Sequence, residues 1–91
     1  MNNQRRKDVQ QGLDKLQEAL NALQEAKEIL ENAAEEEREA FENMPEGLQE
    51  SERGEAMEEA ADTLENVVES IDDQITEIED CVQSIDTTIM Q

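Results

Sequence analysis

Apolar residues recur every three or four positions along most of the chain, a spacing typical of a helix that packs along one seam. The second half shows this most regularly, because its apolar positions alternate spacings of four and three without a break. They are Met57, Ala61, Leu64, Val68, Ile71, Ile75, Ile78, Val82, Ile85 and Ile89. The pattern predicts a helix over about residues 52–89.

The first half follows the same alternation with two interruptions. Its seam positions are Val9, Leu13, Leu16, Leu20, Leu23, Lys27, Leu30, Ala34, Glu37, Phe41 and Met44, so Lys27 and Glu37 stand where apolar side chains are expected. Beside this seam runs a row of small residues, namely Gly12, Ala19, Ala26, Ala33 and Ala40. The spacing predicts a helix over about 4–43. Since small residues let another helix approach closely, we expect this helix to have two packing faces.

Residues 44–51 form the predicted loop between the helices. Pro45 disfavours a helical residue before it, and Gly47 supplies a permissive backbone. Ser51 is the best candidate for the N-cap of the second helix. Gly54, a poor helix former so close to a helix start, indicates a close approach of another backbone segment.

Two long helices of similar length joined by a short loop favour an antiparallel hairpin. At 1.5 Å per residue, each helix would be roughly 55–60 Å long. Folding at the loop would place Lys27 beside Ile71 and within reach of Asp72. It would also place residues 5–7, which are basic, beside Asp86 and the terminal carboxylate. We therefore expect one all-α domain over 1–91.

The hairpin is expected to assemble with copies of itself. Two helices alone bury only one stripe each, and a chain of this size is marginal without further burial. The β-branched seam of the second helix and the small-residue row of the first favour a coiled-coil bundle of several chains. A dimer is the simplest such homo-oligomer, and higher assemblies stay open.

The charge balance narrows the classes of partner. The chain has 26 acidic and 7 basic residues and no His, which gives a net charge of −19. This sign excludes a general nucleic-acid binder. No stretch is long and apolar enough to span a membrane, and the first residues do not resemble a signal peptide. With a single cysteine, Cys81, a reducing compartment and a cytoplasmic location are expected.

Catalysis, a cofactor and a metal site are not expected. Zinc and di-iron sites in helical bundles require His ligands, and the chain has none. Runs such as Glu35 to Glu37 point in different directions around a helix, and no calcium loop is present.

Basic residues are rare in this chain, so those beside the predicted loop are candidates for ligand binding. Two guanidiniums, a ring, a hydroxyl and a permissive glycine could hold an anionic, stacked ligand such as a nucleotide. The candidate residues are Arg38, Phe41, Ser51, Arg53 and Gly54.

The same residues also have a structural explanation. Arg53 could cap the first helix and pair with Glu46 or Glu50, while Phe41 closes the core. Lys27 could pair with Asp72 and fix the register of the helices.

The segment Asn43 to Ala60, NMPEGLQESERGEAMEEA, resembles a segment of small acidic two-helix proteins from bacteriophage and prophage genomes whose function is unassigned. The resemblance implies a phage context, a location in the cytoplasm of the bacterial host and a target in that host, but it assigns no functional residues.

Three functions are compatible with these observations. The first is a protein of immune evasion that sequesters a nucleotide second messenger in pockets of a helical oligomer. The second is an acidic inhibitor, or DNA mimic, that binds a basic host enzyme acting on nucleic acid. The third is a structural or regulatory coiled-coil component of the phage. The distinctive loop favours the first function, as does the expected oligomerisation, since pockets can form between chains, whereas the charge favours the second. The first function is the one that we predict from the sequence.

Overall fold

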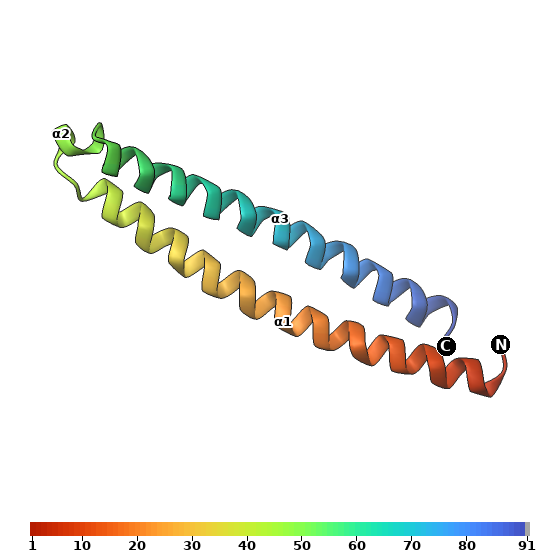
Figure 1. The fold of residues 1–91 in the computed structure, drawn as a ribbon. Helices are drawn as coiled ribbons and strands as arrows, with labels where there is room; N and C mark the ends of the chain where they lie inside the picture. The colour runs from red at the N-terminus through yellow and green to blue at the C-terminus, as the bar shows by residue number, and fades with distance from the viewer. Residues whose placement is uncertain (91) are drawn as a thin grey trace.

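The computed structural model describes residues 1–90 and shows an antiparallel hairpin of two long helices (Figure 1). Helix α1 covers Asn3–Glu42, the short helix α2 covers Glu46–Gln49, and α3 covers Glu52–Thr88. The molecule measures 68 × 16 × 16 Å. The predicted hairpin is confirmed, and both long helices begin and end within about one residue of the predicted positions, which is the ordinary uncertainty of helix ends. The helix α2 was not predicted, because the segment 44–51 was interpreted as a loop.

Both long helices begin at a side-chain cap. The side chain of Asn2 accepts a hydrogen bond of 2.8 Å from the backbone amide of Arg5. Ser51 accepts one of 3.2 Å from the amide of Gly54, which confirms the predicted N-cap. Each bond satisfies one of the amides that a helix start leaves without an intrahelical acceptor.

The core is a single line of side chains between α1 and α3. Its buried members are Leu13, Leu20, Ala34, Ala61 and Ile75, all at predicted seam positions. The other seam residues of α3 are half-buried. An average folded protein of 10.3 kDa exposes about 5,400 Å², whereas this hairpin exposes 6741 Å². The seam is therefore formed but only partly covered.

The hairpin has two unlike faces, one on each side of the seam. Because the helices run antiparallel, each side of the seam is formed by equivalent heptad positions of α1 and α3. Polar contacts between the helices cross one side, which we call the charged face; Lys27–Asp72 and Arg38–Glu65 are examples. By helical geometry the opposite side presents small and apolar residues. We call it the small-residue face; it comprises Gly12, Ala19, Ala22, Ala26, Ile29, Ala33 and Ala40 of α1 with Ala56, Ala60, Thr63, Val67, Ser70, Cys81 and Ser84 of α3.

Within residues 1–90, neither long helix contains an uncharged apolar stretch sufficient to cross a bilayer.

Candidate functional site

The loop end of the hairpin is closed by the side chain of Gln49. Its amide nitrogen lies 3.1 Å from the carbonyl oxygen of Phe41, 3.2 Å from that of Met44 and 3.4 Å from that of Glu42. An amide has two hydrogens, so the three carbonyls share them. These contacts satisfy carbonyls that the C-terminus of α1 would otherwise leave unpaired. Gln49, not Arg53, is therefore the side chain that caps α1.

Ser51 uses its hydroxyl group twice within the loop. It accepts the hydrogen bond from the Gly54 amide and donates one to the carbonyl oxygen of Leu48. The hydroxyl therefore joins the end of α2 to the start of α3.

Gly54 is buried against the end of α2, which confirms the predicted close backbone approach. A Cβ atom at this position would lie less than 3.0 Å from the carbonyl oxygens of Leu48 and Gln49. Because both obstacles are backbone atoms, no side-chain rotation could relieve the clash. Only glycine fits here, for a reason of packing.

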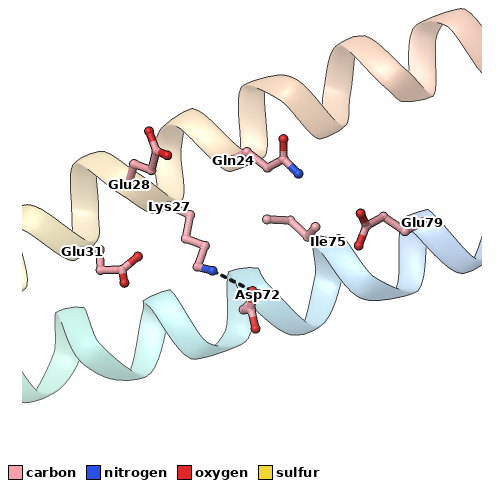
Figure 2. A pocket seen from close by; sticks show the side chains of 7 residues that line it. All are labelled: Gln24, Lys27, Glu28, Glu31, Asp72, Ile75 and Glu79. Atoms are coloured by element: carbon pink, nitrogen blue, oxygen red, sulfur yellow. Dashed lines mark hydrogen bonds and ion pairs between the residues drawn. The ribbon is translucent and has the colours of Figure 1, made fainter.

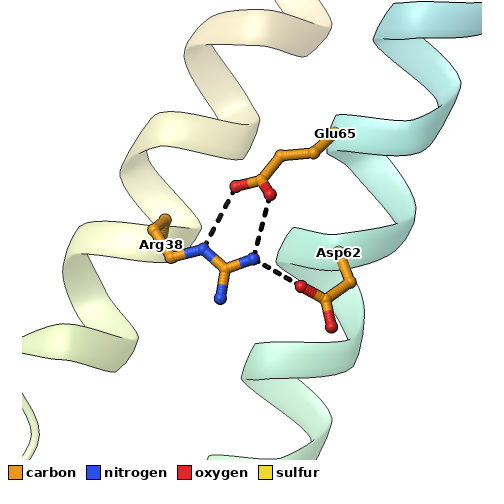
Figure 3. A network of polar contacts seen from close by, with 3 residues as sticks. All are labelled: Arg38, Asp62 and Glu65. Atoms are coloured by element: carbon orange, nitrogen blue, oxygen red, sulfur yellow. Dashed lines mark hydrogen bonds and ion pairs between the residues drawn. The ribbon is translucent and has the colours of Figure 1, made fainter.

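Arg38 points from α1 toward α3 and binds two carboxylates there (Figure 3). Its Nε lies 3.1 Å from Oε2 of Glu65, and its Nη2 lies 3.0 Å from Oε1 of the same residue. Nη2 also donates to Oδ1 of Asp62 at 2.5 Å. The hydrogen bonds to Glu65 and then to Asp62 raise the pKa of Arg38. Two carboxylates thus more than neutralise this guanidinium, which makes it a poor receptor for an anion.

Unlike Arg38, the remaining two predicted ligand residues, Phe41 and Arg53, are not engaged in ion pairs in the described part of the chain. Phe41 is half-buried at the end of α1, and its carbonyl accepts from Gln49. Arg53 is exposed and forms no ion pair within residues 1–90, with Glu46 and Glu50 included. Binding of a ligand at the loop end stays a prediction, with Arg53 as its one cation not engaged in an ion pair.

A shallow depression on the charged face lies at the middle of the rod (Figure 2). Lys27 spans it and donates a hydrogen bond of 2.8 Å to Asp72, which confirms the predicted contact. This hydrogen bond raises the pKa of Lys27 above its ordinary value, although desolvation opposes the shift. The other residues that line the depression are Gln24, Glu28, Glu31, Ile75 and Glu79.

This depression is acidic in spite of Lys27. Four carboxylates line it, and only Asp72 among them forms an ion pair with the lysine. An exposed acidic hollow suits an arginine or lysine side chain of a partner and disfavours a phosphate. The Lys27–Asp72 pair was predicted from the sequence, but the hollow was not. The pattern that could have indicated it is the set of acidic residues that both helices place on the same side of the seam.

The basic N-terminal residues form no ion pair within the described part of the chain. Arg5, Arg6 and Lys7 were expected to lie beside Asp86 and the terminal carboxylate, and no pair with Asp86 is present. The terminal carboxylate belongs to Gln91, which lies outside the described residues. Residues 1–90 also contain no group of three or more acidic or Cys side chains placed to hold a metal ion.

No protein-family model, curated protein or solved structure matches this chain.

Proposed function

We propose that this chain is a non-enzymatic acidic binding protein that docks on a basic protein surface as a nucleic acid would. The observation that carries the proposal is the spacing of its charge. A net charge of −19 along 68 Å amounts to one charge per about 3.6 Å, close to the spacing of about 3.4 Å along one strand of B-DNA. The net charge is that of the full sequence and the length is that of residues 1–90, but both refer to the same charged side chains because Gln91 is neutral.

Few of these carboxylates are neutralised inside the hairpin. The ion pairs of Lys15, Lys27 and Arg38 engage four acidic residues, namely Glu18, Asp72, Asp62 and Glu65. The other 22 of the 26 acidic side chains form no ion pair within residues 1–90. A rod that holds so many free carboxylates accelerates association with a basic groove and selects against acidic partners.

We also propose that the hairpin forms homo-oligomers through coiled-coil packing. The half-buried seam and the large exposed area support this, because both leave apolar surface in water that a second copy could cover. The phage setting implied by the loop segment would make an enzyme acting on nucleic acid in the bacterial host the natural partner.

Sequestration of a nucleotide second messenger is a second candidate, favoured by the exposed guanidinium of Arg53, which forms no ion pair within residues 1–90. Sequestration is the weaker candidate because Arg38 is bound to two carboxylates and the negative electrostatic field of the chain repels anions. Thermal-shift measurements with cyclic dinucleotides and cyclic trinucleotides, on the unmodified chain and on Arg53→Glu, test it. Stabilisation that disappears in Arg53→Glu would favour this candidate over the acidic binding protein.

The acidic binding function is tested by capture from a bacterial lysate on the immobilised chain. We expect a basic nucleic-acid enzyme to be retained, to be displaced by duplex DNA and to elute as salt is raised, because ion pairs at the surface are screened. Replacing Glu28, Glu31 and Glu79 with Gln should weaken capture more than replacing Glu25, Glu39 and Glu59, which changes the charge equally but leaves the hollow intact. Capture that is unaffected by raised salt and is not displaced by duplex DNA would refute the proposal.

A further inference from the structure

The small-residue face is nearly free of charge in a chain that is otherwise densely acidic. Over residues 12–40 of α1 and 56–84 of α3, only Lys15, Glu36 and Glu77 bring charge to it. The charged face, in contrast, is densely acidic on α3 and acidic at about half of its positions on α1. Its acidic residues are Asp14, Glu28, Glu31, Glu35 and Glu42 of α1 and Glu55, Glu58, Asp62, Glu65, Glu69, Asp72, Glu79 and Asp86 of α3. The carboxylates are therefore segregated to one side and to the outer surfaces of the hairpin.

Two of the largest exposed apolar side chains of the hairpin lie on this face. Ile29 of α1 is 67% exposed and Val67 of α3 is 39% exposed. The residues around them are mostly alanine, serine and threonine, which let helix backbones approach closely. The face therefore combines apolar side chains that gain from burial with neighbours that permit close packing.

We infer that two copies of this chain pack side by side through their small-residue faces and form a four-helix bundle. This inference rests on the self-association proposed above and identifies its surface. Net charge selects the surface, because two chains of −19 each repel wherever carboxylates meet, and this face has the fewest. A basic partner would instead prefer the charged face, so the small-residue face fits a second copy better than a basic protein.

The area of the face is sufficient for a stable dimer. The face runs over residues 12–40 and 56–84, a length of about 43 Å at 1.5 Å per residue. With the 16 Å width of the hairpin it offers about 700 Å² per copy, within the roughly 600–1,000 Å² per partner of stable interfaces. Burial of this amount would also remove about half of the surface that the hairpin exposes in excess of a globular protein of its mass.

The bundle would bring the charge density of the rod close to that of duplex DNA. Side-by-side packing doubles the net charge without lengthening the molecule, so the spacing falls to one charge per about 1.8 Å, compared with about 1.7 Å for B-DNA. The charged faces and outer surfaces of both copies would stay accessible. Self-association and the proposed binding of a basic surface therefore use different sides of the same molecule.

Sedimentation equilibrium of the purified chain, with no partner present, tests the interface. We expect twice the 10.3 kDa mass of one chain at micromolar concentration. The double variant Ile29→Glu with Val67→Glu should raise the dimer dissociation constant about tenfold or more, since it places like charges in the interface. The matched control is Asn32→Glu with Asn66→Glu, which adds the same charge on exposed outer positions at the same levels of the rod. This control should remain dimeric.

Cys81 gives a second readout on the unmodified chain. It is exposed in the single hairpin and lies on the small-residue face. Its reaction with a thiol reagent should therefore slow as the protein concentration rises, and it should stay fast in the Ile29 and Val67 double variant. This measurement decides the matter even if that double variant fails to fold.

Three results would overturn the inference: a helical monomer at micromolar concentration, equal dissociation of both double variants, or reactivity of Cys81 that is independent of concentration. The proposed binding function fails separately. Loss of lysate capture with the dimer intact would remove that function alone, and capture by a monomeric chain would remove only the interface.

Discussion

The closed end of the hairpin and its long rod are stabilised by different means. At the closed end, each contact depends on one particular residue: Gln49 caps α1, Ser51 joins α2 to α3, and Gly54 admits the carbonyls of α2. Along the rod, stability comes from a repeated pattern in which most seam positions are only half-buried. Distinctive residues in this chain are therefore used for folding, whereas the proposed binding surfaces consist of repeated, individually ordinary residues.

The largest effect is expected at Gly54. Gly54→Val would force a branched side chain into the Leu48 and Gln49 carbonyls, and overpacking of this kind costs about 1–3 kcal/mol or more. Urea unfolding followed by circular dichroism measures the loss. The control Gly47→Val meets no atom within 4 Å of its Cβ and should have a much smaller effect. Equal losses would show that the end of the hairpin is not clamped at Gly54.

Gln49 should have the next largest effect. Gln49→Ala removes the amide that caps α1, which is equivalent to about two ordinary hydrogen bonds and costs about 1–2 kcal/mol. The same unfolding measurement checks it, with the exposed neighbour Glu50→Ala as control. If both variants unfold at the same urea concentration as the unmodified chain, the carbonyl contacts do not stabilise the closed end.

A smaller loss is expected at Ser51. Ser51→Ala removes the N-cap of α3 at a cost of about 1 kcal/mol, whereas Ser51→Asp should keep most of the stability because a carboxylate accepts the same amide hydrogen bond. A difference in melting temperature between these two variants would confirm capping as the role of this hydroxyl. Identical melting temperatures would show that the bond to Leu48 is the more important one.

The smallest effect belongs to the rod, at Lys27. Lys27→Met continues the apolar seam and should change the stability at neutral pH only slightly. The ion pair that it removes is partly exposed, such pairs contribute at most about 1 kcal/mol, and Asp72, whose side chain is 58% exposed, stays hydrated without its partner. Because the pKa of Lys27 is raised above 10.5 in the folded chain, its contribution is present below pH 10.5 and is lost as the pH rises through the folded-state value. Above pH 10.5, the melting temperature should therefore fall more steeply with rising pH for the unmodified chain than for Lys27→Met. The same dependence of melting temperature on pH in both chains would show that the Lys27–Asp72 ion pair does not stabilise the hairpin.

Much of the rod could be predicted from the sequence, because heptad spacing specifies helix length, pairing and the partner of Lys27. The closed end was harder. Ser51 and Gly54 were recognised as a cap and a close approach, but the helix α2 and the cap by Gln49 depend on how three short segments meet in space. The partners of Arg38 were missed because the sequence offers many acidic residues, and only the register of the hairpin selects Asp62 and Glu65.

Small-angle X-ray scattering of the purified chain tests most directly the claim that the sides of the rod are its binding surfaces. A side-by-side dimer should show twice the 10.3 kDa mass with a radius of gyration still close to the 20.1 Å of one hairpin. The length of the rod stays the same while its cross-section grows. A doubled mass with a radius of gyration about twice as large would place the contact at the ends of the rod, because the radius of gyration of a thin rod is proportional to its length. That result, or a mass of one chain, would contradict the account.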